Sequence, residues 1–284
     1  MKSPRNLAAP PAQRSAETTV SCDVVGYSAL RVTPEMVPAL RQSPGPPGGP
    51  ALPVSFLKHA DEQTVAGLAA VFQAVHRHGL SDTCFTFWGI LAAPRFLGRT
   101  SLAVALHRFR LEGAWGISPH LIPHHSLHSI SGTVSQALGV HGPNFGIGGG
   151  PHAADEAFLV AAALLAGDQV PGVWVVLTGF DPEPSPEDPG RAPAAAPGHP
   201  GAVPVCGAVA LALVAARPVS PNLKLHIAPG PVAGGTRLNG YCQGAPPFSL
   251  EALVETLAAE PAGAWQLHSG GRLELRRPTA GAEN

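Results

Sequence analysis

Apolar positions along this chain follow a helical spacing in some stretches and form short continuous runs in others. The clearest helical pattern covers residues 61–78, where apolar side chains recur every three or four positions and Gly79 stands where a C-terminal cap belongs. Other helices are expected at residues 126–138, 151–166 and 250–259. In the 151–166 helix, Pro151 suits the first helical position, and Asp155 and Glu156 complement the positive end of the helix dipole.

Short apolar runs rich in β-branched and aromatic residues predict buried strands between these helices. They cover residues 22–30, interpreted as a short strand followed by a turn, and residues 84–91, 173–178, 205–215, 223–227 and 272–276. The succession of helix, glycine turn and strand is typical of an α/β layered domain. Two Pro- and Gly-rich stretches, 42–53 and 184–204, are predicted as loops, and residues 1–20 as a flexible tail.

The composition excludes several classes of function. The chain has 284 residues, of which 45% are hydrophobic and 13% charged, with a formal net charge of -1. A nucleic-acid partner is not expected, because phosphate binding needs a basic surplus. No apolar run is long enough to span a membrane or to serve as a signal peptide, so a cytoplasmic protein is expected. Four widely spaced cysteines, Cys22, Cys84, Cys206 and Cys242, are interpreted as buried thiols in a reducing compartment.

Glycines dominate the segment 142–150, which precedes the predicted helix at 151–166. Gly148, Gly149 and Gly150 could form a phosphate cradle at a helix N-terminus, but the spacing matches neither a Walker A loop nor a dinucleotide fingerprint. A sharp strand-to-helix turn is the favoured interpretation. His152, two residues after Gly150, is a candidate acid or base, with capping or packing as the alternative role.

Histidines cluster at His120, His124, His125 and His128. If one helix carried both His124 and His128, the two would lie one turn apart, a spacing that can bind zinc, and His141 and His152 could approach them. A polar loop over a cleft is the favoured interpretation, so no metal or other cofactor is expected.

Two groups of charged residues admit both a functional and a structural interpretation. Asp181, Glu183, Glu187 and Asp188 are interpreted as a solvated acidic loop rather than as paired catalytic carboxylates. Arg95 and Arg99 could contact an acidic helix of an acyl carrier, or form surface salt bridges.

The stretch 117–181 resembles the β-ketoacyl synthases of the thiolase superfamily. The resemblance lies in Ser118-Pro119, Ile122-Pro123, Ser131-Gly132, Leu138-Gly139 and Gly142-Pro143-Asn144, followed by His152-Ala153, Glu156-Ala157-Phe158 and the run VWVVLTGFD at 173–181. It implies a thiolase-like layered fold, a mixed sheet flanked by helices. Residues 21–216 would form one half-length repeat, and residues 217–284 a short extension that completes or covers the sheet.

The chain departs from that family at the nucleophile. Condensing enzymes of the family present a cysteine at the start of the helix that follows the Gly-Pro-Asn motif, where the helix N-terminus favours the thiolate. Here no Cys or Ser stands between Asn144 and Phe158, and the turn is Gly148-Gly149-Gly150. His226 and His268, in the C-terminal extension, lack the family's catalytic histidine motifs and are assigned no catalytic role.

The resemblance therefore implies a non-condensing subunit that works beside an active ketosynthase, as chain length factors do, or a homodimer, with an acyl carrier protein as a further partner. By the same analogy, residues 84–91 or their neighbours would form the shared interface. The alternatives are a module that binds an acyl group or acyl carrier without chemistry, and a metal-dependent enzyme built on His124 and His128.

Overall fold

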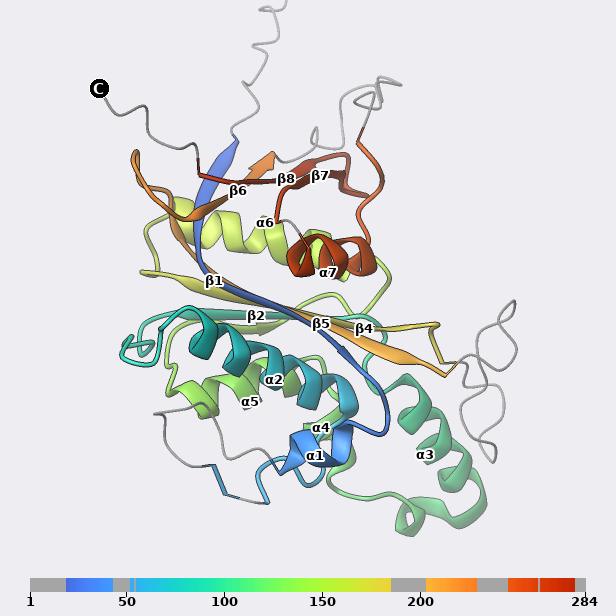
Figure 1. The fold of residues 1–284 in the computed structure, drawn as a ribbon. Coiled ribbons are helices and arrows are strands. Elements are labelled where there is room, and N and C mark those ends of the chain that lie inside the picture. Colours follow the sequence, from blue (N-terminus) through green and yellow to red (C-terminus); the bar gives the residue numbers. More distant parts are fainter. Residues whose placement is uncertain are drawn as a thin grey trace, which may run out of the picture.

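The computed structural model describes residues 19–42, 52–53, 55–184, 203–228, 245–259 and 261–278. In these residues one mixed sheet of eight strands, in the order β3-β2-β4-β5-β1-β6-β8-β7, lies between two helical layers (Figure 1). The expected α/β layered fold with a mixed sheet is confirmed. The predicted loops at 42–53 and 184–204 and the tail lie almost wholly outside the described residues.

The strands fall into a parallel part and an antiparallel part. Strand β2 pairs in parallel with β3 on one side and with β4 on the other, whereas all other pairs are antiparallel. The bounds are β1 Val20–Val32, β2 Gly89–Pro94, β3 Asn144–Gly146, β4 Val173–Asp181, β5 Val205–Ala215, β6 Leu223–Ala228, β7 Gly263–Gln266 and β8 Arg272–Arg276. Strands β2 and β4 are buried on both faces, as their continuous apolar runs require.

One face of the sheet is covered by α2 (Glu62–Arg77) and α5 (His128–Leu138), with the short helices α1 (Val37–Arg41) and α4 (Leu121–His125) beside them (Figure 1). Helix α2 lies close to the sheet because Gly67 faces it. A Cβ at that position would lie 3.1 Å from Val176 and 3.2 Å from Ile130.

The other face is covered by α6 (Ala153–Ala166) and α7 (Leu250–Ala258), which share a core with strands from both ends of the sheet (Figure 1). Phe158 on α6 is fully buried there. Helix α7 and strands β6 to β8 belong to the C-terminal segment. Strand β6 pairs with β1, so this segment continues the same sheet and also covers α6.

Several predicted boundaries are wrong, each for a local reason. The strand expected at 84–91 is Gly89–Pro94, because the aromatic residues before it form a turn that packs Trp88 against Trp174. The helix expected from Pro151 begins at Ala153, and the one expected from residue 126 begins at His128, since Ser126 is extended (φ -86, ψ 158).

The sequence pattern also failed to predict α3 (Arg99–Glu112) and the 3-10 helix η1 (Gly113–Gly116). Helix α3 has no buried residue, so it has no apolar face turned to the core that periodicity could detect. Within the part of the chain that the structure describes, no helix combines the length and apolarity required to cross a membrane.

Candidate functional site

The topology makes the carboxyl end of β2 the candidate position for a site. The connection from β2 to β3 packs α5 on one face of the sheet, and the connection from β3 to β4 packs α6 on the other. Ligands of open α/β sheets bind where consecutive connections diverge in this way, at the carboxyl ends of the strands. The candidate site is therefore built from the residues that follow β2, β3 and β4.

A glycine turn, residues 146–150, leads from β3 toward α6. The backbone N–H of Ile147 donates to the carbonyl of Ala92 over 2.8 Å, which holds the turn beside the end of β2. Gly148 and Gly149 have φ values of 72° and 93°, in the region that favours glycine. A Cβ at Gly148 would lie 2.6 Å from the Cβ of Ala153, so the turn is closed against the helix start.

Gly150 differs from its two neighbours in this turn. A Cβ added there would meet no heavy atom within 4 Å, and its φ lies outside the left-handed region. Among the three glycines, Gly150 is thus the position where a side chain fits without strain.

Phe96, which sequence analysis did not single out, lies against the glycine turn. Its backbone N–H donates to the carbonyl of Gly149 over 3.0 Å, and its φ of 51° is unusual for a residue with a large side chain. The guanidinium of Arg99 lies 5.0 Å from the centre of its ring. Such backbone strain gathers at functional sites, and no periodic pattern in the sequence signals it.

Two histidines meet at the start of α6. His152, the residue before the helix, stacks on His268 of the C-terminal segment, with ring centroids 3.6 Å apart and 2° between the planes. The buried carboxylate of Asp155 accepts hydrogen bonds from the backbone N–H groups of His268 and, over 3.4 Å, of Ser269. The structure thus places His268, to which the sequence assigned no role, at the start of the helix that follows the glycine turn.

Arg95 follows β2 and contacts the end of β4 and the start of α7 through ion pairs and a hydrogen bond. Its guanidinium lies 3.4 Å from the carboxylate of Glu183 and 2.9 Å from that of Glu251, and it donates to the carbonyl of Phe180. Arg95 therefore forms salt bridges, one of the two roles expected for it, although its side chain is partly buried at 23% exposure. The carbonyl of Arg95 in turn accepts from Gln63 over 3.0 Å.

The prediction that Glu183 belongs to a solvated acidic loop is wrong, because its side chain is only 21% exposed and lies beside Arg95. Burial raises the pKa of Glu183 to about 7, although the nearby Arg95 and Arg99 act in the opposite direction. Asp181 is exposed, as expected, and Glu187 and Asp188 lie outside the described residues.

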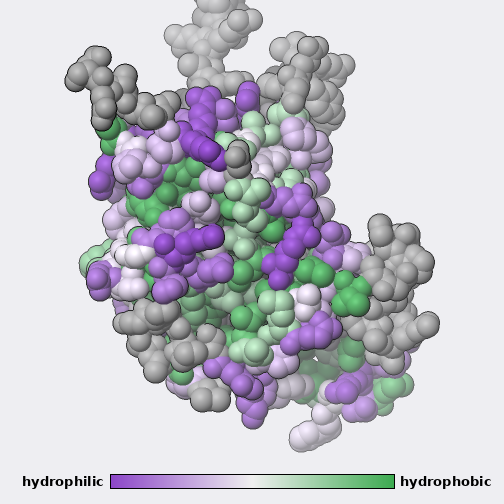
Figure 2. All heavy atoms as spheres, in the orientation of Figure 1, coloured by the Kyte–Doolittle hydropathy of each residue, from purple (hydrophilic) through white to green (hydrophobic). Residues whose placement is uncertain are grey.

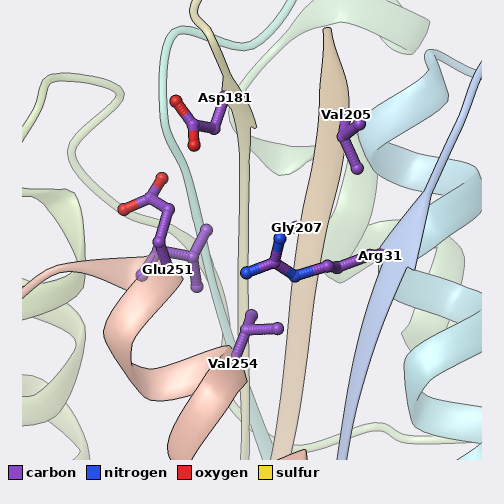
Figure 3. Close-up of a pocket in the computed structure, with 7 residues that line it drawn as sticks. Arg31, Asp181, Val205, Gly207, Glu251 and Val254 are labelled. Atoms are coloured by element: carbon purple, nitrogen blue, oxygen red, sulfur yellow. The ribbon is translucent and has the colours of Figure 1, made fainter.

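A small pocket opens beside this ion-pair cluster, between α7 and the ends of β1, β4 and β5 (Figure 3). In Figure 3 the side chain of Arg31 extends across β5 toward α7, where Glu251 and Val254 lie. The volume is about 80 Å³, far below the roughly 300 Å³ at which small-molecule sites begin. The pocket has room for a few water molecules but not for an acyl chain.

The three described thiols lie away from the start of α6. Cys206 on β5 pairs with Phe180 and belongs to the core on the α2 side, and Cys22 lies at the amino-terminal end of β1. Burial raises the pKa of Cys22 to about 12 and that of Cys206 further. Cys84 is exposed, and its hydrogen bonds with Thr86 lower its pKa, but it precedes β2 at the strand's amino end.

The histidine cluster is arranged differently from the sequence hypothesis. His124 lies in α4, which ends at His125, and His128 begins α5, so the two do not share a helix. Instead His124 lies beside His59 and His120, with ring centroids 5.8 and 6.0 Å away. Among the residues described, no group of three or more His, Cys, Asp or Glu side chains is arranged to hold a metal ion.

The neighbouring histidines have other contacts. Nδ1 of His125 lies 3.4 Å from the carboxylate of Asp61, the N-cap of α2. His128 contacts the hydroxyl of Ser131, and His152 pairs with His268 rather than with the cluster.

No family model matches this chain, and no curated protein does. Solved structures do match. The ishigamide ketosynthase/chain length factor is 16% identical, with a TM-score of 0.50, and the match covers 73% of this chain and 65% of that one. AntDE:AntF, a type II PKS acyl-carrier protein in complex with its ketosynthase, is 14% identical, with a TM-score of 0.46 and coverage of 70% and 64%. The ketosynthase ApeO in complex with its chain length factor ApeC from Xenorhabdus doucetiae is 12% identical, with a TM-score of 0.46 and coverage of 72% and 60%.

The similarity to the ishigamide ketosynthase/chain length factor shows that this chain has the thiolase-like α/β fold of ketosynthase and chain length factor structures. The chain spans less than two thirds of the length of each of these three structures, between 60% and 65%. At this level of identity the similarity shows the fold alone, because one fold can host many unrelated functions.

Proposed function

We propose that this protein is a ketosynthase-like subunit that does not condense acyl groups and acts beside an active ketosynthase in fatty-acid or polyketide-type biosynthesis. The observation that carries the proposal is the glycine turn before α6, which offers no sulfur or hydroxyl nucleophile between Asn144 and Phe158. Formation of an acyl-enzyme requires a nucleophile at the acceptor position. The described thiols do not replace it, because they lie on β1, on β5 and before β2.

The partner subunit is inferred from the solved structures that resemble this chain. The ishigamide and ApeO structures pair a ketosynthase with a chain length factor, and AntDE:AntF contains an acyl-carrier protein. A subunit with this fold but without the nucleophile would contribute to a shared assembly rather than to bond formation. Its own turn would then shape the surroundings of an acyl chain held by the partner.

The test is acyl loading followed by mass spectrometry of the intact protein. The wild type, mixed with an acyl-phosphopantetheine thioester, is expected to gain no covalent acyl group at residues 144–158. Gly150→Cys provides a positive control, because a side chain fits at that position and the thiol is detectable with iodoacetamide. Thioester turnover by the wild type, or acyl loading that persists after Cys84→Ser removes the exposed thiol, would contradict the proposal.

A further inference from the structure

Two histidines that are far apart in the chain form a ring pair at the protein surface. His152 precedes α6, and His268 lies in the turn between β7 and β8. Their rings are parallel to within 2°, with centroids 3.6 Å apart, and both residues are exposed. In Figure 2 hydrophilic residues reach the surface in the upper part of the molecule, where Figure 1 places β7 and β8. Dissolved ions can therefore reach the pair.

The nitrogens of both rings are unused within the described part of the chain. The side chain of His152 does not cap α6, and the hydrogen bond from His268 to Asp155 comes from its backbone N–H. A neutral imidazole has one nitrogen with a free lone pair, and imidazole is the commonest side-chain ligand of metal ions. The pair thus offers two nitrogen ligands from two separate segments.

The spacing of the two rings matches the spacing of two ligands on one metal ion. Zinc binds imidazole nitrogen at about 2.1 Å, so two such ligands in a tetrahedral arrangement lie roughly 3.4 Å apart. The ring centroids of His152 and His268 are 3.6 Å apart. Rotation of the rings about their Cβ–Cγ bonds, a torsion that is broad in histidine, would direct one nitrogen of each toward a common ion.

The backbone that carries His268 is held in place before an ion arrives. Asp155, whose side chain is buried, accepts hydrogen bonds from the backbone N–H groups of His268 and Ser269. The N–H of Leu267 donates to the carbonyl of Gly271 over 2.8 Å, which closes the turn. Ligands that are already ordered lose less conformational entropy on binding, so this arrangement favours affinity.

The charge at the start of α6 favours a cation. Asp155 and Glu156 place two carboxylates in the first turn of the helix, whereas a helix N-terminus contributes only about half a positive charge. The negative charge therefore exceeds the positive charge of the helix dipole, and a dication beside the two histidines is stabilised.

We propose that His152 and His268 together bind one divalent transition-metal ion of the class of Cu²⁺, Ni²⁺ and Zn²⁺. Water or an external ligand fills the other coordination positions, since no third His, Cys, Asp or Glu ligand is arranged there among the described residues. The ion would connect the C-terminal segment to the start of α6. Cu²⁺ should bind most tightly of the three, following the general order of affinities. This inference goes beyond the proposed function and does not depend on it.

The test is calorimetric titration of the protein, without a histidine tag, with Cu²⁺, Ni²⁺ or Zn²⁺ alone. The wild type should bind one equivalent. His152→Phe and His268→Phe each keep an aromatic ring in the stack but remove its nitrogens. Each should weaken binding roughly tenfold or more, because loss of even an outer-shell partner has an effect of that size. His59→Phe/His124→Phe is the matched control, since these rings belong to the other histidine group and lie 5.8 Å apart.

Electron paramagnetic resonance of the Cu²⁺-loaded protein counts the bound nitrogens. We expect two imidazole nitrogens in the wild type and one in each single variant, with weaker binding at acidic pH because imidazole binds metal in its neutral form. Circular dichroism verifies folding, and His152→Gln and His268→Gln replace any Phe variant that does not fold. A wild type that binds no ion overturns the proposal. Binding that survives in both ring variants, or that only the control loses, also overturns it.

None of these outcomes bears on the absence of a nucleophile between Asn144 and Phe158, so failure of the metal site leaves the proposed function standing.

Discussion

The imidazole rings of His152 and His268 lie parallel, with their centroids 3.6 Å apart, although one belongs to the glycine turn region and the other to the C-terminal segment. The carboxylate of Asp155 fixes this arrangement, because it accepts hydrogen bonds from the backbone N–H groups of His268 and Ser269. The C-terminal segment therefore packs against the start of α6, next to the glycine turn on which the proposed function depends.

Replacing Asp155 by Ala should weaken the contact between the C-terminal segment and the start of α6. Removal of a buried carboxylate that accepts two backbone hydrogen bonds leaves both N–H groups unsatisfied, so we expect a loss of about 2 to 4 kcal/mol in the free energy of unfolding. Hydrogen exchange at residues 268 and 269 should increase. Glu156→Ala is the matched control, because Glu156 is exposed in the same helical turn, and it should change stability by less than about 0.5 kcal/mol. Equal effects of the two variants would contradict the assignment.

The glycine turn should tolerate a side chain at one position and resist it at another. Gly148→Ala forces a Cβ into Ala153 at a φ of 72°, so we expect a loss of about 1 to 3 kcal/mol, measured by urea unfolding. Gly150→Ala, in the same turn, should be neutral or slightly stabilising, since its Cβ would meet open space. A Gly148→Ala protein as stable as the wild type would show that the turn is not closed against α6.

Glu183 should make stability depend on pH. Its pKa is raised from 4.5 to about 7, so the folded state favours the protonated form. The contribution of Glu183 is therefore fully present below the unfolded pKa near 4.5 and is lost as pH rises through 7. Wild-type stability should fall by on the order of 2 kcal/mol between pH 5 and pH 8 through this group.

Glu183→Gln tests this assignment, because the amide stays neutral at every pH. Relative to the wild type, the variant should become progressively more stable from pH 5 to pH 8. Glu255→Gln is the control, since Glu255 pairs with Arg31 at the surface and is 70% exposed. A difference between Glu183→Gln and wild type that is the same at both pH values would contradict the raised pKa.

The described thiols should differ in reactivity in a Cys242→Ser background. Cys84 is exposed and its pKa is lowered by hydrogen bonds with Thr86, so it should react rapidly with a disulfide reagent in the native protein. Cys22 and Cys206 are buried and their pKa values are raised, so they should react only on unfolding. Cys84→Ser is then expected to abolish the fast phase, and a fast phase that persists would place another thiol at the surface.

The apolar patterns were sufficient to predict the strands around 22–30, 173–178 and 205–215 and helix α2, because burial on one or both faces leaves a periodic trace in the sequence. The same patterns predicted an α/β layered domain, whereas the mixed sheet followed from the resemblance to β-ketoacyl synthases. They did not predict α3, whose packing partner is not in the described core, or the start of β2, because aromatic residues of the preceding turn are as apolar as a strand.

The amino-acid sequence by itself determined the absence of a nucleophile between Asn144 and Phe158, the glycines that make the turn, and the elements on either side. Only the tertiary structure decided that His268 meets His152, that Arg95 and Glu183 pair at a partly buried position, and that His124 and His128 separate. The reason is physical: local spacing records which face of an element is buried, whereas pairing between distant segments depends on the order of strands in the sheet. That order is set by the sum of many contacts, and no short stretch of the chain contains it.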